Sequence, residues 1–410
     1  MVTKTPRRER KCTMKTNQTD KNPISRVARR AYRTTLCSVL RLLLVAALLS
    51  TTLSVLAGAV DVGGKRHVDT MTINLYVGGG TGRVVALNPA DPGYLTNLVA
   101  TVTGVYYEIL ASQPPVRLQG VADEIATRMP DIVAVEEASL IRTESPGDLI
   151  VGGTKPATHV VLDYLQILTD ALAARGAPYT VVSSANEIDV ELPLFNLQTG
   201  GVDDVRLTDR DAILVRTDLP LGQLHVWNAQ HGNFKNVVQI SSIGLSVLRG
   251  WCSVDVWARG EQFRYICTHL EEETLPQIQL LQAQELLSGP ARINLPVILA
   301  GDFNADTLHR NGTRTYDALI AAGFTDAWAA LHPADLAGGL TWGHDELLAD
   351  PGTPPVWRID LVLFRGTRFG ATQAETIDIA LNRTQLPLWA SDHAGVAAQI
   401  RFQPGAKRLH

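Results

Sequence analysis

Runs of apolar residues end at polar side chains in several parts of the chain, and the clearest run lies at 296–300. It holds proline, valine, isoleucine, leucine and alanine, and Gly301, Asp302 and Asn304 follow it. A short apolar run of this kind is typical of a strand buried on both faces. Glycine with aspartate, and asparagine with alanine, are also ordinary turn sequences. Taken alone, the stretch therefore predicts either a simple turn or a polar site at the end of a buried strand.

The spacing of apolar residues predicts the other elements. Apolar positions three and four apart indicate helices, and short apolar or alternating runs indicate strands. The predicted helices are 95–112, 117–128, 160–175, a segment ending at 287, and 314–322. The predicted strands are 70–77, 131–135, 296–300, 356–364, 395–402 and, in a second sheet, 179–183, 188–192, 205–207 and 212–216. The polar and aromatic segment 219–238 is predicted to be a loop.

Strands that alternate with helices, followed by runs of consecutive strands, predict an α/β fold in which two packed sheets carry helices outside. A hairpin is expected at 251–270, with Arg259 and Gly260 as its two-residue turn. That register places Cys252 directly opposite Cys267. The two cysteines could form a disulfide in an exported protein. They could equally stay free, because this register makes them a hydrogen-bonded pair with the wider Cα separation.

The first sixty residues differ from the rest. Residues 1–41 hold twelve Lys or Arg and two acidic residues, whereas the nineteen residues 42–60 carry no charge. A basic segment, an apolar core and small residues after it predict an export signal cleaved after Ala59. The alternative is a membrane anchor at 42–60, whose length approaches a bilayer span. Translation could start at Met1 or Met14. The chain is thus divided into 1–59, a linker at 60–69, one folded domain at 70–403 and a tail at 404–410.

The charge of the chain changes when the export signal is removed. Residues 60–410 retain 25 of the 37 Lys and Arg and 39 of the 41 Asp and Glu, a formal charge of −14. Affinity for long nucleic acid comes largely from Lys and Arg that replace counterions along the phosphates. The domain is therefore poorly suited to extensive nucleic-acid binding unless cations or a local basic patch assist. We expect it to be secreted or otherwise extracytoplasmic.

Polar residues stand at the ends of predicted strands in six short motifs. In chain order these are Thr72-Ile73-Asn74, the segment 130–137 ending in Glu136-Glu137, Thr268-His269-Leu270, Gly301-Asp302-Phe303-Asn304, Arg358-Ile359-Asp360 and Ser391-Asp392-His393. Together they resemble the endonuclease/exonuclease/phosphatase superfamily, which has the DNase I-like fold, over about 70–402. The resemblance implies a four-layer α/β/β/α sandwich of two packed, mostly antiparallel or mixed sheets. Helices would lie outside, with the site at one edge where the sheets meet.

Two positions depart from the superfamily pattern. Glu136 stands where relatives commonly have glutamine, and we expect it to alter the local charge without abolishing activity. Cys267 stands where many relatives have threonine or asparagine. Its side chain should point away from that of Thr268, so we do not expect Cys267 to be a nucleophile.

The resemblance also implies a metal site. Glu137 would be the principal ligand of a divalent ion, with Asn74 close by and Asp392 as a further ligand. Mg²⁺ is expected, because it typically takes one or two carboxylates and completes its shell with water and substrate. Mn²⁺ or Ca²⁺ would be alternatives. One ion and two ions are both compatible with the motifs.

The other motif residues would act on the phosphate and on water. Asp302 would be the general base or would orient water, and Asn304 would position the same water or a phosphate oxygen. His269 and His393 would donate hydrogen bonds to the phosphate. Asp360 beside His393 would raise the pKa of that ring and favour its cationic form.

Two further residues have alternative interpretations. Arg210 precedes a strand at which relatives place a phosphate-contacting residue, but it could instead form an ion pair with Asp209 or Asp211. Trp342 would line the substrate cleft or be a large buried aromatic.

The sequence thus predicts a secreted, Mg²⁺-dependent phosphoesterase that uses a metal-activated water and no covalent intermediate. The bond hydrolysed would be a phosphodiester or a phosphomonoester, and the substrate a small phosphodiester, a phospholipid headgroup or nucleic acid. An extracellular nuclease is the alternative enzyme, and a binding protein without catalysis is the alternative from another class. No obligate protein partner is indicated. A membrane would be contacted only through an uncleaved N-terminal segment.

Overall fold

The computed structural model describes residues 66–240, 245–351 and 355–403. The predicted export signal, the alternative start at Met14 and the tail at 404–410 lie outside the described residues. None of the helices in the described part of the chain is long and apolar enough to cross a bilayer. The first strand, β1, begins at His67, so it includes the end of the segment predicted as a linker.

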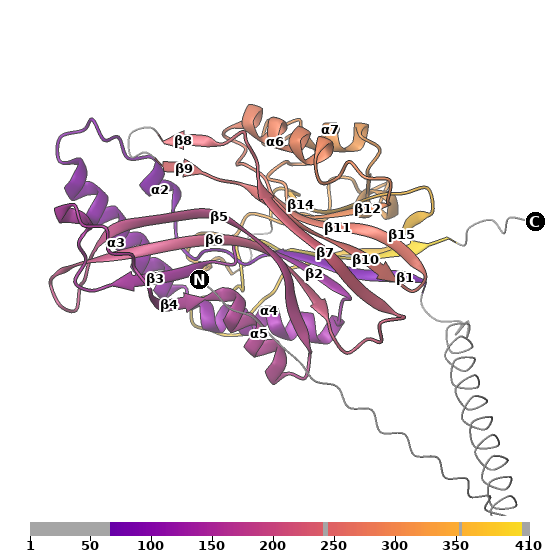
Figure 1. Ribbon diagram of the computed structural model, residues 1–410, viewed down its shortest axis with the longest axis horizontal. Helices are drawn as coiled ribbons and strands as arrows, with labels where there is room; N and C mark the ends of the chain where they lie inside the picture. Colours follow the sequence, from indigo (N-terminus) through magenta and orange to yellow (C-terminus); the bar gives the residue numbers. More distant parts are fainter. Residues whose placement is uncertain (1–65, 241–244, 352–354, 404–410) are drawn as a thin grey trace, which may run out of the picture. The chain divides into compact units, whose positions relative to one another are not determined.

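Two sheets form the centre of the fold (Figure 1). The strands of the first are β1 (His67–Asn74), β2 (Ile132–Glu136), β3 (Leu140–Glu144), β4 (His159–Asp163), β5 (Tyr179–Phe195), β6 (Val202–Arg216), β15 (Phe369–Ile377) and β16 (Gly395–Phe402). Their order is β15-β16-β1-β2-β6-β3-β4, and β5 also pairs with β6. The strands of the second are β7 (Leu224–Asn233), β10 (Gly250–Ala258), β11 (Glu261–His269), β12 (Val297–Asp302), β13 (Thr325–Asp326) and β14 (Asp360–Arg365), in the order β13-β14-β12-β11-β10-β7. A small separate sheet pairs β8 (Val238–Ile240) with β9 (Leu245–Val247).

The helices are α2 (Gly82–Val85), α3 (Tyr94–Ala111), α4 (Pro114–Arg128), α5 (Tyr164–Ala174), α6 (Pro276–Ser288), α7 (Thr315–Ala321) and α8 (Ala327–Leu331), with a 3₁₀ turn at Leu149–Val151. The longer helices cover the outer faces of the sheets, whereas α8 packs against the core between them. The apolar sides of α3, α4 and α5 pack on the first sheet, and those of α6 and α7 pack on the second. A third core lies between the inner faces of the sheets. The predicted four-layer α/β/β/α sandwich is confirmed.

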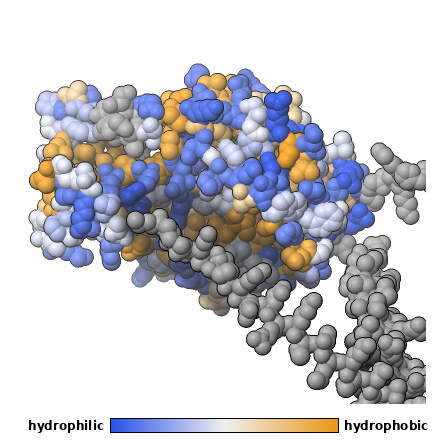
Figure 2. All heavy atoms as spheres, in the orientation of Figure 1, coloured by the Kyte–Doolittle hydropathy of each residue, from blue (hydrophilic) through white to orange (hydrophobic). Residues whose placement is uncertain are grey.

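Parallel strand pairs explain why the longest apolar runs are fully buried. β1 pairs with β2 and β11 pairs with β12 in parallel, so each pair needs a crossover through helices. β2 and β12 also have a second neighbour, β6 and β14 respectively, and all their residues are buried. Over the face drawn in Figure 2, hydrophilic residues alternate with smaller apolar patches. The apolar runs therefore lie inside, as their unbroken pattern predicts.

Three sequence predictions in the middle of the chain are wrong. The segment 160–175 is not one helix: its start belongs to β4, and Asp163 then caps α5 by accepting a hydrogen bond from the backbone N–H of Gln166 at 3.3 Å. The four short strands from 179 to 216 are two long strands, β5 and β6, and they belong to the first sheet. Irregular steps in their pairing interrupt the alternation of burial, which explains why the pattern resembled separate strands.

Two boundaries in the second sheet also differ from expectation. The predicted loop 219–238 contains the edge strand β7, most of whose side chains are exposed because only β10 lies beside it. The predicted strand 356–364 is regular only from Asp360 onward. β15, which was not predicted, pairs with β16 at the edge of the first sheet. Edge strands lack a fully buried apolar face, so their sequences carry a weak strand signal.

The predicted hairpin is confirmed. β10 and β11 pair with Ala258 opposite Glu261, so that Arg259 and Gly260 form the turn. Cys252 lies opposite Cys267, and both are buried free thiols.

A buried arginine on α4 holds together the backbone near one edge of the first sheet. Arg117 is fully buried and donates hydrogen bonds to four backbone carbonyls. Its Nη1 lies 2.8 Å from the oxygens of both Leu75 and Ala390, its Nη2 lies 2.9 Å from that of Tyr76, and its Nε lies 3.1 Å from that of Ser112. The guanidinium therefore joins the end of β1 to the segment before β16.

We expect Arg117→Met to lower the free energy of unfolding by more than about 3 kcal/mol, because each buried carbonyl left without a donor costs about 1–3 kcal/mol. Urea unfolding of the two purified proteins measures the change. Arg128→Met is the matched control, since Arg128 lies on the same helix in surface ion pairs with Glu124 and Glu375 and should cost less than about 1 kcal/mol. Equal losses in the two variants would contradict the assigned role of Arg117.

Candidate active site

Three ionisable side chains stand in one row at an edge of the second sheet. β11 ends at His269, β12 ends at Asp302 and β14 begins at Asp360. Asp302 pairs in register with His269 on its parallel neighbour and with Asp360 on its antiparallel neighbour. Gly301 makes this close pairing feasible, because a Cβ there would lie 2.0 Å from the carbonyl oxygen of Thr268. The residues after the opening apolar run thus form part of a polar cluster as well as a turn.

The first sheet contributes Asn74 and Glu137 to the same place. Asn74 ends β1, and Glu137 follows β2 with a left-handed φ of 53°. The side-chain nitrogen of Asn74 donates to Glu137 Oε1 at 3.0 Å and to Asp302 Oδ2 at 3.2 Å. Its oxygen accepts from the backbone N–H of Tyr76 at 2.9 Å. Asn74 therefore turns its nitrogen, not its oxygen, toward Glu137, and its role as a metal ligand stays a prediction.

His393 and Asp360 form a buried ion pair. His393 Nδ1 lies 2.8 Å from Asp360 Oδ2, while its Nε2 lies 3.7 Å from Asp302 Oδ2 and 4.0 Å from Asp392 Oδ1. Burial alone lowers the pKa of His393, but Asp360, Asp392 and Asp302 together outweigh it and hold the pKa well above 6.5. The ring is therefore a cation surrounded by carboxylates.

Asp302 is placed where its protonation can change near neutral pH. Burial, and then the charge of Asp360, raise its pKa to about 7, whereas His393 acts in the opposite direction. Its Oδ1 accepts a 2.8 Å hydrogen bond from the backbone N–H of Asn304, a residue with a φ of 48°. The side chain of Asn304 in turn donates to the carbonyl of Leu270 at 3.0 Å. A carboxylate with this pKa is suited to accept a proton from water.

His269 has the opposite electrostatic environment. Burial, and then the positive charge of Arg249, hold its pKa well below 6.5. Arg249 Nη1 lies 3.0 Å from Nδ1 and 3.1 Å from Nε2 of the ring. A donor equidistant from both nitrogens cannot point along either lone pair, so the guanidinium packs against the ring. Nε2 of the neutral ring faces the side-chain nitrogen of Asn304 at 3.1 Å and Asp302 Oδ2 at 3.5 Å.

The donor set fits a hard divalent cation. Burial and the charge of Glu137 raise the pKa of Asp392 to about 6, with His393 acting in the opposite direction. Asp302, Asp360 and His393 each offer a ligand atom within 4.8 Å of the others. Carboxylates crowded in this way repel one another unless a cation or a proton lies among them. Glu137 and Asp392 would supply oxygen ligands to such an ion.

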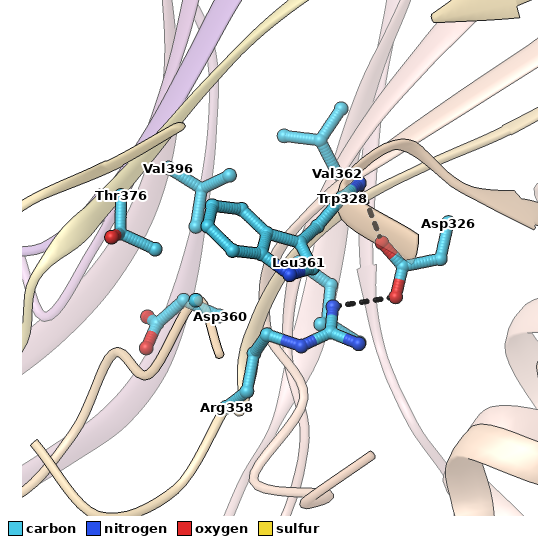
Figure 3. A pocket seen from close by; sticks show the side chains of 9 residues that line it. Asp326, Trp328, Arg358, Asp360, Leu361, Val362, Thr376 and Val396 are labelled. Atoms are coloured by element: carbon cyan, nitrogen blue, oxygen red, sulfur yellow. Dashed lines mark hydrogen bonds and ion pairs between the residues drawn. The ribbon is translucent and has the colours of Figure 1, made fainter. Parts of the chain in front are cut away.

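A small cavity adjoins Asp360 beneath the site (Figure 3). Its walls include Trp328 and Val396, and Arg358 lies beside it in a 2.5 Å ion pair with Asp326. Asp360 Oδ1 and Arg358 Nε are buried without a hydrogen-bond partner among the described residues. The cavity therefore offers polar atoms to a water molecule that would support Asp360, and its mainly apolar walls do not suit a phosphate.

Arg210 and Trp342 are both close to the site. Arg210 donates to the carbonyl of Ala138 at 2.8 Å and pairs with Asp163 at 2.6 Å. The alternative pairing with Asp209 or Asp211 is wrong, because alternation along β6 turns those side chains to the other face. Arg210 is thus held next to the residue that follows Glu137, and a phosphate contact stays a prediction.

Trp342 is partly exposed and is therefore not a buried core aromatic. Its ring stacks on that of Trp357 with centroids 4.6 Å apart. It also forms a β-bridge with His393, which places it beside the cluster.

The two departures from the superfamily pattern are in direct contact. Glu136 is fully buried and accepts hydrogen bonds from Thr72 Oγ1 at 2.9 Å and from Cys267 Sγ at 3.3 Å. Burial, and then the charge of Asp360, raise its pKa well above the usual range. Burial thus disfavours the charged form of Glu136, and the expected change in local charge stays a prediction. Cys267 lies in the core between the sheets.

Several polar residues near His269 were not predicted as part of the site. Arg249 and Glu187 lie in segments without a local motif, so no sequence signal could have identified them. Asp209 and Asp211 were noted, but the charged sequence around Arg210 resembled an exposed surface. They are in fact buried, and Ser139 donates to Asp209 at 3.1 Å.

Comparison with known proteins identifies the family. The Endonuclease/Exonuclease/phosphatase family model matches residues 71–393. Similar solved structures include a family protein from Leptotrichia buccalis, with 13% identity and a TM-score of 0.48, over 82% of this chain and 100% of that chain. A mannosyl-6-phosphatase from Bacteroides thetaiotaomicron has 16% identity and a TM-score of 0.47, over 82% and 100%. A family protein from the same organism has 17% identity and a TM-score of 0.49, over 83% and 100%. No curated protein sequence matches the chain. Since the family model covers most of the chain, the protein belongs to the endonuclease/exonuclease/phosphatase family.

Proposed function

We propose that this chain is an exported, divalent-metal-dependent hydrolase of phosphoric esters, with Mg²⁺ as the ion and Mn²⁺ or Ca²⁺ as alternatives. The family consists of enzymes that act on phosphoester bonds, and apart from Glu136 this chain has the polar residues that the resemblance assigns to the site. The observation that carries the proposal is the row formed by His269, Asp302 and Asp360, which meets His393 and Glu137 at one place.

Each residue of the cluster has a task in phosphoester hydrolysis. The cationic ring of His393 would bind a nonbridging phosphate oxygen, and Asp360 would keep that ring charged and oriented. The neutral ring of His269 would donate a hydrogen bond to the phosphate without adding charge. Asp302 would accept a proton from the attacking water, which Asn304 would help to position. None of these side chains needs to form a covalent intermediate.

A bound divalent ion would neutralise the phosphate oxygens and make water more acidic. Glu137 would hold it together with Asp392. The hydrogen bonds to Glu137 from Asn74 and from the backbone N–H of Val77, at 3.0 and 2.7 Å, would fix the orientation of its carboxylate. Such support is typical of ligating carboxylates.

The negative charge of residues 60–410 favours a small phosphodiester or a phospholipid headgroup over duplex DNA. An extracellular nuclease is the second candidate within the same chemistry. A binding protein without catalysis is the third, and the retained Glu137, Asp302 and both histidines argue against it.

A substrate panel tests the proposal. We expect Mg²⁺-dependent release of nitrophenol from mono- or bis-nitrophenyl phosphate, or turnover of sphingomyelin, and little nicking of plasmid DNA. Excess chelator and Glu137→Ala should each abolish turnover. Activity that survives chelation would contradict metal dependence. If the wild-type protein, like Glu137→Ala, turned over none of these substrates, the enzyme proposal would be excluded.

Asp302→Asn should keep the fold and the bound metal but slow hydrolysis about 10²–10⁴-fold, the usual contribution of a general base. The rate with saturating nitrophenyl substrate and the Mg²⁺ affinity from calorimetry measure the two effects separately. Asp317→Asn is the control, because Asp317 is an exposed carboxylate on α7 in a surface pair with Arg314. An unchanged rate in Asp302→Asn would mean that this residue only shapes the turn.

Asp360→Asn should lower the pKa of His393 in metal-free protein, because it removes the carboxylate 2.8 Å from the ring while burial remains. Proton NMR of the His393 ring, assigned with His393→Gln, measures the pKa. The stability that the ion pair contributes should be full below pH about 6.5, the usual histidine pKa, and be lost as pH rises through the raised pKa of the folded protein. Wild type should therefore exceed Asp360→Asn in stability most clearly at low pH. An identical ring pKa in both proteins would refute the pairing.

A further inference from the structure

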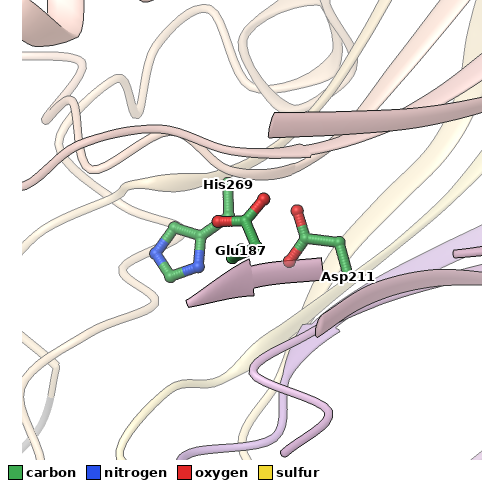
Figure 4. A group of neighbouring side chains, drawn as sticks. All are labelled: Glu187, Asp211 and His269. Carbon is green, nitrogen blue, oxygen red and sulfur yellow. The ribbon is translucent and has the colours of Figure 1, made fainter. Parts of the chain in front are cut away.

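A second group of buried ionisable side chains lies beside His269, between the two sheets (Figure 4). Glu187 comes from β5 and Asp211 from β6, and their carboxylates lie next to the imidazole of His269. The predicted catalytic roles use neither Glu187 nor Asp211. The group therefore needs its own explanation.

The carboxylates of Glu187 and Asp211 lack well-formed hydrogen bonds in the described part of the chain, and the contacts of Glu187 with Asp211 and with the backbone N–H of Gly250 are weak. Both residues are fully buried, and none of their four carboxylate oxygens has a hydrogen-bond partner among the described residues. An ionised carboxylate is costly to bury without compensation. Either protons or a cation must therefore neutralise the pair.

The nearby charges do not balance. Four buried carboxylates are involved: Glu187, Asp209, Asp211 and Glu271. Arg249 supplies one positive charge, with Nη1 3.8 Å from Glu187 Oε2 and Nε 3.7 Å from Glu271 Oε1. If all four carboxylates were ionised, the cluster would still have an excess of negative charge after that guanidinium is counted, and a divalent cation would neutralise part of it.

The positions of the ligand atoms also favour an ion. One atom each from Glu187, Asp211 and His269 lie within 4.8 Å of one another. The ring is not hydrogen-bonded to either carboxylate. A tetrahedral ion with bonds of about 2.0–2.2 Å holds its ligand atoms about 3.3–3.6 Å apart, which lies within this limit. Since Nε2 of His269 faces Asn304 and Asp302, Nδ1 is the nitrogen on the side of the acidic pair. Arg249 Nη1 lies 3.0 Å from Nδ1, so the guanidinium would have to move aside for an ion to bind there.

We propose that Glu187, Asp211 and His269 form a separate site for one divalent transition-metal ion, Zn²⁺ or Mn²⁺. One imidazole with two carboxylates is a mixed nitrogen and oxygen set that suits these ions better than Mg²⁺. The site is distinct from the one predicted around Glu137, and it does not depend on whether the chain hydrolyses phosphoesters. An ion on Nδ1 would leave the ring proton on Nε2 and so fix the tautomer of His269. That proton would point toward Asp302, and the Asn304 amide nitrogen, 3.1 Å from Nε2, could then no longer donate to the ring.

Protons are the competing explanation. Without an ion, burial raises the pKa of Glu187 to about 8 and that of Asp211 well above its usual range. A metal would have to displace those protons, so binding should release protons into solution. Calorimetry in two buffers with different ionisation enthalpies measures that release.

The experiment counts ions in full-length protein that carries Glu137→Ala, which removes the principal ligand of the other site. After equilibrium dialysis against Zn²⁺ or Mn²⁺, elemental analysis should find one ion per chain, bound with proton release. Adding Glu187→Gln should weaken binding at least tenfold. Asp189→Asn is the matched control, because Asp189 lies two residues further along β5 in a partly exposed pair with Arg206, and it should leave binding unchanged.

Either of two results would overturn the proposal. In the first, the Glu137→Ala protein binds no ion, and its infrared spectrum has a protonated carboxyl band that disappears when Glu187→Gln is added. This result would show that protons neutralise the pair. If adding Glu187→Gln or Asp211→Asn to the Glu137→Ala protein left ion binding unchanged, the ion would belong to another site. Neither readout involves substrate, so failure here is distinguishable from failure of the proposed hydrolysis.

Discussion

The amide group of Asn74 joins the two sheets at the point where their polar residues meet. It donates to Glu137, which follows a strand of the first sheet, and to Asp302, which ends a strand of the second. The lengths of these two hydrogen bonds depend on the separation of the sheets, which the packing of their apolar inner faces sets. Ser391 donates to the carbonyl of Asn74 at 2.7 Å and thereby brings the segment with Asp392 and His393 to the same place. The core between the sheets thus sets the distances in the site.

Much of the fold could be predicted from the sequence because its central strands have clear apolar patterns. The strands around Asp131 and Pro296 are continuous apolar runs in the middle of sheets, where every side chain is buried. The polar residues after those runs were not decided by the runs themselves, which allowed a simple turn as well as a polar site; the resemblance of the six motifs to the superfamily identified them as a site. The two-residue turn at Arg259 and Gly260 set the pairing register of the strands β10 and β11 on either side of it. For these strands and for the hairpin turn, the local sequence was sufficient to predict the structure.

The parts that could not be predicted depend on partners far away in the chain. β7 has an exposed pattern and exists because β10 offers it hydrogen bonds. β5 and β6 have interrupted alternation, and only their mutual pairing makes them continuous. Arg249 and Glu187 are polar residues without a motif, and their burial next to His269 follows from the packing of the two sheets. Sequence patterns report the burial of an element, but they do not report which distant charge it will face.

The two histidines of the site show how such neighbours decide chemistry. His393 has a carboxylate 2.8 Å from Nδ1, and the surrounding carboxylates outweigh the effect of burial, so the ring is charged. His269 has Arg249 against its ring, and both this charge and burial keep it neutral. A phosphate between them would meet one cation and one uncharged hydrogen-bond donor. Two cationic rings would repel each other and would also hold Asp302 ionised well below neutral pH, where it would be a weaker base. The difference between the rings therefore allows one carboxylate beside both of them to accept a proton near pH 7.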